Sequence, residues 1–314
     1  MFKEAKVMFI YTESSLHCGS GTSLGVIDLP IQREKYTGFP VCQASGIKGV
    51  VREWFENKYN DKDFRIKYTF GPDFGSNKDE GDAHAGAATF TDGRLLLFPV
   101  RSLNEVFAYT TSRFALSRLK RDLEMAGKKV DWTFPTESED KIAGVEGSRI
   151  SDSNNKVVLE EYTFDFQPDD GVKAIAQWIA NNAIPQGDEY KFWRDKVKTD
   201  LLILPENAFR DFVKLSTEVQ ARIQIDNKTK TVKSGALFYE EALPSDSLLY
   251  SVVMAHDPAC DEKKRPDGLK TSTDVMTFLS EINTQRLQFG GDATIGKGIV
   301  NVNLLNVGMS HESY

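Results

Sequence analysis

A single carboxylate stands out in the segment "GVIDLPIQRE" (residues 25–34), where Asp28 follows a glycine-rich loop and precedes basic residues. An aspartate in this position often only caps a turn, since Pro30 favours extended backbone at Leu29. The alternative is a reactive carboxylate presented to the phosphates of a nucleic acid. One carboxylate also suffices for a hard divalent cation that takes its other ligands from water and substrate phosphates. Asp28 is therefore a candidate catalytic residue and a candidate metal ligand.

Three glycine-bearing loops could present backbone N–H groups to an anion. They are "HCGSG" (17–21), "ASGIKG" (44–49) and "GGDATIGKG" (290–298). Such loops approach phosphates closely, and a helix N-terminus adds partial positive charge. None of the three fits the established phosphate-loop or dinucleotide patterns, so each alone is at least as typical of a tight turn. Lys48 and Arg52 lie near the second loop. Taken together, the three loops and these two cations fit a phosphate-binding surface as well as they fit ordinary tight turns.

The remaining titratable candidates are a histidine and a pair of glutamates. His17 precedes Cys18, and neighbours on a strand point to opposite faces, which disfavours a shared zinc ion. His17 is either an acid–base group near a phosphate or an ordinary structural histidine. Glu240 and Glu241 in "FYEEALP" lie beside an aromatic residue. A solvated strand end is the favoured interpretation of this glutamate pair.

Composition is that of a globular protein rather than a membrane protein. The chain has 314 residues, of which 40% are hydrophobic and 27% charged. No apolar run approaches the roughly 18 residues of a membrane span, and the N-terminus does not resemble a secretory signal. Three cysteines, Cys18, Cys42 and Cys260, cannot all be paired and form no metal-binding spacing. These features indicate a reducing cytoplasm and no membrane partner.

The net charge of −7 alone would argue against a nucleic-acid partner. Its distribution weakens that argument, because residues 111–130 hold six Lys or Arg and two Asp or Glu, whereas residues 131–170 hold three and eleven. Binding depends on local potential rather than on total charge. A basic surface is compatible with this composition.

Hydrophobic periodicity predicts a mixture of strands and helices. The stretch "ASGIKGVVREWFENKY" has apolar residues at helical spacing, with Ser45 as the expected N-cap. Strands are expected near 5–13, on both sides of an Asp92-Gly93 turn, near 156–164, 221–225, 235–241, 248–255 and at the final "GIVNVNLL"; helices are expected near 112–126, 172–184, 205–216 and from 270. This irregular alternation predicts an α+β domain with an antiparallel sheet and packed helices. Without a clear linker, residues 1–314 are expected to form a single domain with an acidic insertion at about 131–170 and a hairpin at about 221–241.

Five segments in this order carry a resemblance to a known family. They are "HCGSGTSLGVIDLPIQRE", "ASGIKGVVREWF", "DGRLLLFPVRS", "GALFYEEALP" and "LQFGGDATIGKGIV". The set closely resembles the backbone subunits of type III-B CRISPR effectors, the Cmr complexes, in the RAMP superfamily. The resemblance implies a modified ferredoxin-like (RRM-like) core with large insertions and a protruding thumb hairpin. It also implies copies stacked head to tail along a CRISPR RNA, beside other Cmr subunits, that cut complementary single-stranded target RNA at regular intervals.

The resemblance assigns roles to individual positions. Asp28 falls on the loop aspartate that supports cleavage with a divalent metal, Mg²⁺ or Mn²⁺, while His17 and Glu240 fall at further positions near the cleavage site. The guide-binding pattern S-x-x-K-G-x-x-R matches at Ser45, Lys48, Gly49 and Arg52. The remaining expected RNA contacts come from the glycine loops and their neighbours: Gly19, Gly21, Arg33, Gln43, Gly290, Gly291 and Lys297. The stretch "CQASG" departs from the Pro-Gly-Ser of many relatives, which makes the contact at Gln43 less well defined.

Three other functions stay open on sequence alone. The same scaffold could bind guide RNA while a partner cuts the target. It could be a stand-alone metal-dependent nuclease or guide-processing enzyme, although this would favour a denser carboxylate or histidine cluster. The type III-A backbone subunit is a near relative, and "DLPIQRE" with the "GALFYEEALP" hairpin favours type III-B.

Overall fold

The apolar run at the start of the chain forms a strand that is buried on both faces. In the computed structural model, which describes residues 2–60, 63–72, 84–136, 138, 141–260 and 265–305, this strand is β1 (Glu4–Thr12). Its side chains alternate between two hydrophobic clusters, with Met8 and Ile10 in one and Val7 and Phe9 in the other. Double-sided burial explains the unbroken "VMFIY" sequence. Parts of the predicted 1–314 domain and 131–170 insertion lie outside the described residues.

Strand β1 lies in a sheet of 12 strands. Ten of them follow in the order β13 (Arg286–Gln288), β14 (Ile299–Leu304), β1, β12 (Leu248–Ala255), β4 (Gly93–Arg101), β5 (Phe107–Ser112), β9 (Leu201–Leu204), β6 (Lys141–Gly144), β8 (Tyr162–Pro168) and β7 (Lys156–Leu159); β2 (Val41–Cys42) pairs with β4, and β3 (Ala88–Phe90) pairs with β12. The pairs β5–β9 and β6–β8 are parallel and the others antiparallel. The α+β class is confirmed, but the sheet is mixed, not purely antiparallel.

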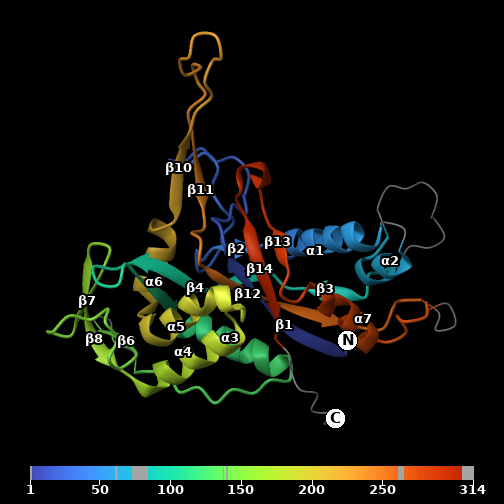
Figure 1. Ribbon diagram of the computed structural model, residues 1–314, viewed down its shortest axis with the longest axis horizontal. Helices are drawn as coiled ribbons and strands as arrows, with labels where there is room; N and C mark the ends of the chain where they lie inside the picture. Colours follow the sequence, from blue (N-terminus) through green and yellow to red (C-terminus); the bar gives the residue numbers. More distant parts are fainter. Residues whose placement is uncertain are drawn as a thin grey trace.

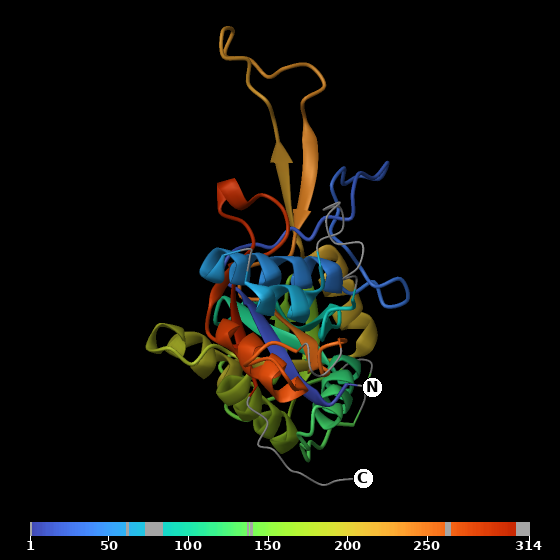
Figure 2. The ribbon, with the colours of Figure 1, turned by 90° about the vertical axis from the view of Figure 1, so that its right-hand side faces the viewer.

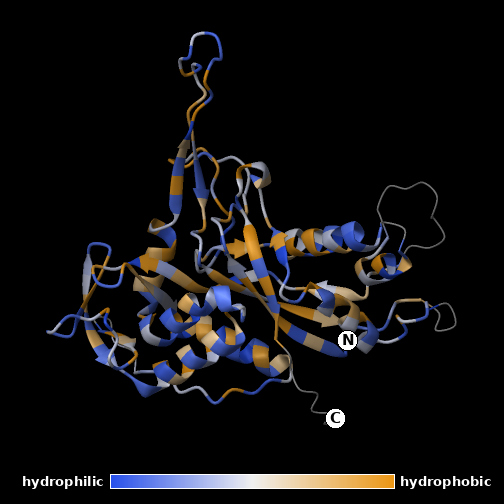
Figure 3. Ribbon diagram, in the orientation of Figure 1, coloured by the Kyte–Doolittle hydropathy of each residue, from blue (hydrophilic) through white to orange (hydrophobic). Residues whose placement is uncertain are grey.

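Helices cover both faces of this sheet. The cluster containing Met8 also takes in residues of α1 (Ala44–Tyr59), α2 (Phe64–Phe70), α6 (Glu206–Leu215) and α7 (Ser272–Leu279). The cluster containing Phe9 takes in residues of α3 (Arg113–Met125), α4 (Asp170–Asn182) and α5 (Lys191–Asp200). Figure 3 shows that the helices, and β14 as well, carry both hydrophobic and hydrophilic residues. No helix in the described ranges is long and apolar enough to cross a membrane.

A second, two-stranded sheet projects from this body. It pairs β10 (Glu218–Arg222) with β11 (Phe238–Ala242), and the chain between them continues outward as a long loop. Figures 1 and 2 show the hairpin extending well beyond every helix from either direction of view. The loop around Asp28 and the glycine loop before β14 lie at its base. The 12-stranded sheet and its helices thus form the body of the protein, and the β10–β11 hairpin projects from it.

Several local expectations are wrong in detail. Asp92-Gly93 does not reverse the chain, because β3 and β4 both run antiparallel to β12 and so form one interrupted strand. The stretch 156–164 is not one strand but parts of two, β7 and β8, which turn at Glu160 with a positive φ of 49°. Helix α1 has Gln43, not Ser45, at its N-cap.

Candidate active site and RNA-binding surface

Asp28 is held at the base of the projecting hairpin by three backbone contacts. Its N–H donates to the carbonyl of Tyr239 (3.1 Å), and its Oδ2 accepts the N–H of Tyr239 (2.7 Å). Its own carbonyl accepts the N–H of Ser23 (2.8 Å). The side chain stays half-exposed. Asp28 thus does fix backbone, as a turn aspartate would, but it does so on β11 and remains open to solvent.

His17 is enclosed by backbone from three segments. Its Nδ1 lies 2.6 Å from the carbonyl oxygen of Glu241. Because a carbonyl oxygen can only accept, Nδ1 carries the hydrogen, and in the neutral ring Nε2 is left as an acceptor. A Cβ added at Gly19 would lie 2.6 Å from Nε2. A side chain at position 19 would collide with the imidazole, so glycine at this position lets the loop pass over His17.

The glycine loop before β14 closes on the same histidine. The N–H of Gly291 donates to the carbonyl of His17 (2.9 Å). Gly290 has a φ of 72°, and a Cβ built there would fall 2.2 Å from that same carbonyl oxygen. Two of the three glycine loops identified in the sequence thus pack against each other around His17.

The expectation of a solvated end for Glu240 and Glu241 is wrong. Each residue is only 3% exposed. Oε2 of Glu240 accepts from Nη2 of Arg222 (2.6 Å) and lies 3.5 Å from Nζ of Lys297. Burial opposes ionisation, but hydrogen bonds from Asp292 and Arg222 and the charge of Lys297 hold the pKa of Glu240 at about 2. Glu240 is a buried, ionised carboxylate.

Glu241 uses its carboxylate to hold the segment that follows Asp28. Its Oε1 accepts from Nη2 of Arg33 (2.5 Å) and its Oε2 from the N–H of Ile31 (3.0 Å). Nη1 of Arg33 donates to the carbonyls of Gly38 and Val213, both at 2.9 Å. The donors of Arg33 are thus directed into the protein, and Lys297, only 6% exposed, likewise faces inward.

The start of α1 is linked to these loops through one glutamine. Oε1 of Gln32 accepts the N–H of Gln43 (3.1 Å), and its Nε2 donates to the carbonyl of Gly19 (2.9 Å). Oδ1 of Asp92 accepts the N–H of Ala44 (2.8 Å). This last bond places a carboxylate where a phosphate could otherwise bind the helix N-terminus.

The exposed positions in the first turns of α1 lack bulky side chains. Gln43, Ser45 and Gly49 are exposed, and a Cβ at Gly46 or Gly49 would meet no atom within 4 Å. Two of the three basic residues of this helix, Lys48 and Arg52, lie close to this segment and contact the protein. Nζ of Lys48 donates to the carbonyl of Ala88 (3.3 Å), and Arg52 pairs with Glu56 (2.6 Å). Burial, then the nearby Arg52 charge, lowers the pKa of Lys48. A polymer backbone could approach this face closely.

Comparison with known proteins identifies the family. The sequence model of the RAMP superfamily matches residues 9–301. The chain belongs to the RAMP superfamily. Among its relatives is the "CRISPR system Cmr endoribonuclease Cmr4" of Pyrococcus furiosus, 39% identical over 310 residues that cover 97% of each chain.

Solved structures agree with this membership. The crystal structure of oligomeric Cmr4 from Pyrococcus furiosus matches with a TM-score of 0.73 and 33% identity, covering 98% of this chain and 99% of the other. A chain of the type III-B Cmr-beta complex in its apo state matches with a TM-score of 0.69 and 25% identity, covering 96% and 97%. The likeness extends over nearly the whole RAMP chain.

The described residues of this RAMP protein do not build a metal cage. No group of three or more His, Cys, Asp or Glu side chains in the described ranges could hold a metal ion. Asp28 fits a divalent ion only as a single ligand, which leaves the rest of the coordination shell to water and phosphate oxygens.

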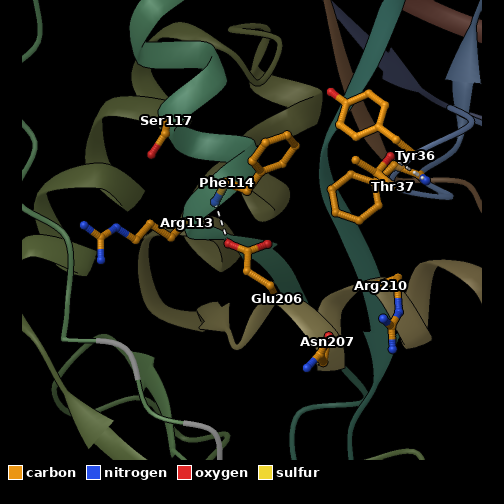
Figure 4. Close-up of a pocket in the computed structure, with 9 residues that line it drawn as sticks. Tyr36, Thr37, Arg113, Phe114, Ser117, Glu206, Asn207 and Arg210 are labelled. Atoms are coloured by element: carbon orange, nitrogen blue, oxygen red, sulfur yellow. Dashed lines mark hydrogen bonds between the residues drawn. The ribbon is translucent and has the colours of Figure 1, made fainter.

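One open pocket lies apart from these loops. It has a volume of about 490 Å³ between the 36–39 loop and the first turns of α3 and α6. Figure 4 shows Glu206 pointing to the start of α3, where its Oε1 accepts the N–H of Phe114 (2.6 Å). None of the residues proposed for RNA contact or catalysis lines it. The candidate site is therefore a surface at the hairpin base and not this pocket.

Two residues at the hairpin base were not singled out in the sequence. Arg222 and Asp292 both lie next to Glu240, and their side chains approach to 3.6 Å. The position of Asp292 inside the glycine loop "GGDATIGKG" could have marked it as a candidate site residue. Its proximity to Arg222 is visible only in the folded structure.

Proposed function

We infer that this chain is the backbone subunit of a type III-B CRISPR effector and that it cleaves guide-complementary target RNA within the assembled complex. The relative named as a Cmr endoribonuclease, matched over almost the whole of both chains, supports this activity. The observation that carries the site assignment is Asp28, a half-exposed carboxylate fixed to Tyr239 of β11, the strand whose Glu241 carbonyl contacts His17. Expected partners are CRISPR RNA, target RNA, further copies of the chain stacked head to tail and other Cmr subunits.

RNA supplies its own nucleophile, which reduces the task of the protein to positioning and charge stabilisation. In the proposed step a 2′-oxygen attacks the adjacent phosphorus, the bond from phosphorus to the 5′-oxygen breaks, and the leaving oxygen gains a proton from water. Asp28, directly or through water, accepts the proton of the 2′-hydroxyl. His17 and Glu240 are buried, so they would orient the strand through the loops that they hold in place. A bound Mg²⁺ or Mn²⁺, held by Asp28, would neutralise charge on the phosphate.

Guide RNA is proposed to lie along the exposed face of α1 and the neighbouring loops. A subunit that accepts any guide must use phosphates and backbone amides in place of base edges. Exposed Gln43, Ser45, Gly49 and Gly21 support such contacts, as do Lys48 and Arg52 if they exchange internal partners for phosphates. Gly19, Gly290 and Gly291 shape the surface around His17, and the inward-facing Arg33 and Lys297 support it from inside.

We also propose a ferredoxin-like core with insertions. The chain order β1, α1, β4, β12, α7, β14 and the sheet order β14-β1-β12-β4 support it, since this is the β-α-β-β-α-β arrangement. Residues between β4 and β12 would then be inserted, including the 131–170 segment and the β10–β11 hairpin as the thumb. Free thiols at Cys18, Cys42 and Cys260 fit a reducing cytoplasm.

Substituting Asp28→Asn in the assembled complex tests the activity. Complexes carrying guide RNA are incubated with complementary RNA in Mg²⁺ and in EDTA, with the exposed Asp267→Asn as control. Asp28→Asn should retain guide RNA but lose about 100-fold or more in cleavage rate, since it removes a proton-accepting group. Cleavage at the wild-type rate would instead favour the non-catalytic scaffold, with cutting by another subunit.

A further inference from the structure

The open pocket between the 36–39 loop and the first turns of α3 and α6 takes no part in the proposed cleavage reaction. Its volume of about 490 Å³ falls within the range of small-molecule sites. Phe39 lines it, is only 4% exposed, and packs its ring against those of Phe114 and Phe209, with centroid distances of 6.2 and 5.1 Å. Aromatic rings therefore form the base of this pocket.

The loop that forms one wall of the pocket is fixed by largely buried contacts. Glu34 accepts two hydrogen bonds from the guanidinium group of Arg118 in α3 (2.9 and 2.6 Å), and both side chains are only 11% exposed. The Glu34 carboxylate also accepts the hydroxyl of Thr37 (2.7 Å). Nη1 of Arg33 donates to the carbonyl of Gly38 (2.9 Å). Because the wall is held in this way, a ligand can bind without first ordering the loop.

The mouth of the pocket combines an exposed aromatic ring with two cations. Tyr36 is 75% exposed and meets the ring of Phe114 edge to face, with the centroids 6.4 Å apart. Arg113 and Arg210 also line the pocket, and Figure 4 shows them on opposite sides of Glu206. Glu206 is the only acid among the described lining residues, and its Oε1 accepts the N–H of Phe114 (2.6 Å). A flat ring that carries a phosphate matches this combination, since a base stacks on an aromatic face and a guanidinium group binds phosphate.

The pocket belongs to the same chain segment as the proposed catalytic residue. Tyr36 follows Asp28 by eight positions, which span at most about 28 Å even in fully extended backbone. Glu241 holds this segment at Arg33, whose Nη1 reaches Gly38 in the pocket wall. A strand of RNA that passes Asp28 therefore reaches the pocket within several nucleotides.

We propose that this pocket binds one unpaired nucleotide, with its base stacked on Tyr36 and its phosphate beside Arg113 or Arg210. The inference rests on the proposed function and adds an RNA contact away from α1 and the hairpin base. Stacking suits a subunit that must accept any target, because every base has a flat face. The same chemistry fits a nucleotide within an RNA strand and a free nucleoside monophosphate, and the experiment separates these two sources. A protein segment would also fit an aromatic pocket, but the two guanidinium groups and the connection to Asp28 favour RNA.

The first arm of the test uses complete complexes and complementary RNAs that each carry a single 4-thiouridine at a successive position. Hydrogen replaces the reactive 2′-hydroxyls of these RNAs, so the target stays intact whether or not Asp28 is catalytic. Irradiation should crosslink the probe to the peptide that contains Tyr36, at positions that repeat along the target.

Tyr36→Ala should abolish this crosslink and release the target about tenfold faster or more, as expected for the loss of a stacked base. Tyr36→Phe keeps the ring and should behave as the wild type. Tyr162→Ala is the matched control, because it removes an aromatic ring that is 56% exposed but lies outside the pocket. Thermal unfolding checks that each variant is folded.

The second arm titrates the full chain with uridine 5′-monophosphate. Binding that Tyr36→Ala removes, without an RNA crosslink, would assign the pocket to a free nucleotide. Wild-type release by Tyr36→Ala in the presence of the crosslink, or absence of both the crosslink and nucleotide binding, would overturn the proposal. Loss of a protein subunit from the Tyr36→Ala complex, with neither RNA signal, would show that the pocket is a protein contact instead. Failure of the proposed cleavage activity is distinguishable, because Asp28→Asn tests it separately and neither binding measurement depends on cutting.

Discussion

Glu240 and Glu241 are neighbours in the chain but stabilise different parts of the site. Adjacent side chains of a strand point in opposite directions, so Glu240 reaches Arg222 and Lys297 while Glu241 reaches Arg33. The sequence separation is 57 residues for Glu240–Lys297 and 208 for Glu241–Arg33. A local sequence pattern cannot show which residues pair at such separations. The sequence therefore favoured a solvated strand end for Glu240 and Glu241. Asp28 and His17 could be proposed as site residues from the sequence because their loops have distinctive local sequences.

At the residue scale, Gly19→Ala should impair cleavage without preventing folding. The new methyl group would lie 2.6 Å from Nε2 of His17, so the imidazole must move away from its place beside the glycine loop. We expect a loss of about tenfold or more in target cleavage, because catalysis depends on accurate placement. The measurement is the single-turnover rate of complexes matched for guide content.

Gly25→Ala is the matched control for this change. It lies in the neighbouring loop, and an added Cβ there meets only the Ser23 hydroxyl at 3.3 Å. Equal rates for the two variants would contradict the proposed role of His17.

At the element scale, helices were easier to predict than strand partners. The apolar spacing in α1 predicted its buried face, where Ile47, Val51 and Phe55 are indeed inside. Its N-cap was missed because the capping carboxylate, Asp92, comes from between β3 and β4. The parallel pairing of β5 with β9 was also missed, since period-two alternation identifies a strand but not its neighbour. Local periodicity predicts helices and strands, whereas the packing of the whole chain determines which strands pair.

Helix α1 offers a test of backbone approach by RNA. Gly49→Ala should stabilise the isolated protein by about 0.5–1 kcal/mol, because glycine is unfavourable inside a helix and the added methyl group meets no other atom. Guide affinity should fall about three- to tenfold, or roughly 1 kcal/mol, if the RNA backbone contacts this surface. Urea unfolding and a guide-binding titration measure the two effects.

Asn57→Ala serves as the control on the same helix. It is exposed near the C-terminal end, away from the S-x-x-K-G-x-x-R segment. If Gly49→Ala shows the expected gain in stability but binds guide RNA as tightly as the wild type, then α1 is not part of the RNA-binding surface.

At the scale of the whole molecule, the body and the hairpin have separate tasks. The sheet and its two helix layers bury the hydrophobic clusters, while the projecting segment exposes apolar side chains such as Ile223, Ile225, Val232 and Leu237. An exposed apolar surface on a projection is typical of an interaction site. The base of the hairpin also holds Asp28, so the element that reaches outward is attached directly to the proposed catalytic residue.

Shortening the hairpin should therefore separate target cleavage from folding and guide binding. Hydrogen bonds described for residues 224–236, such as those at Asp226 and Lys233, stay within the hairpin. Replacing this stretch by an Asn-Gly turn should change the free energy of unfolding by about 1 kcal/mol or less, since only loop closure is altered. Guide RNA should still copurify with the complex. Cleavage at regular intervals should be lost, because we expect the hairpin to hold the target strand in distorted form beside Asp28. A shortened variant that yields the complete product ladder at the wild-type rate would show that the body positions the target strand without the hairpin.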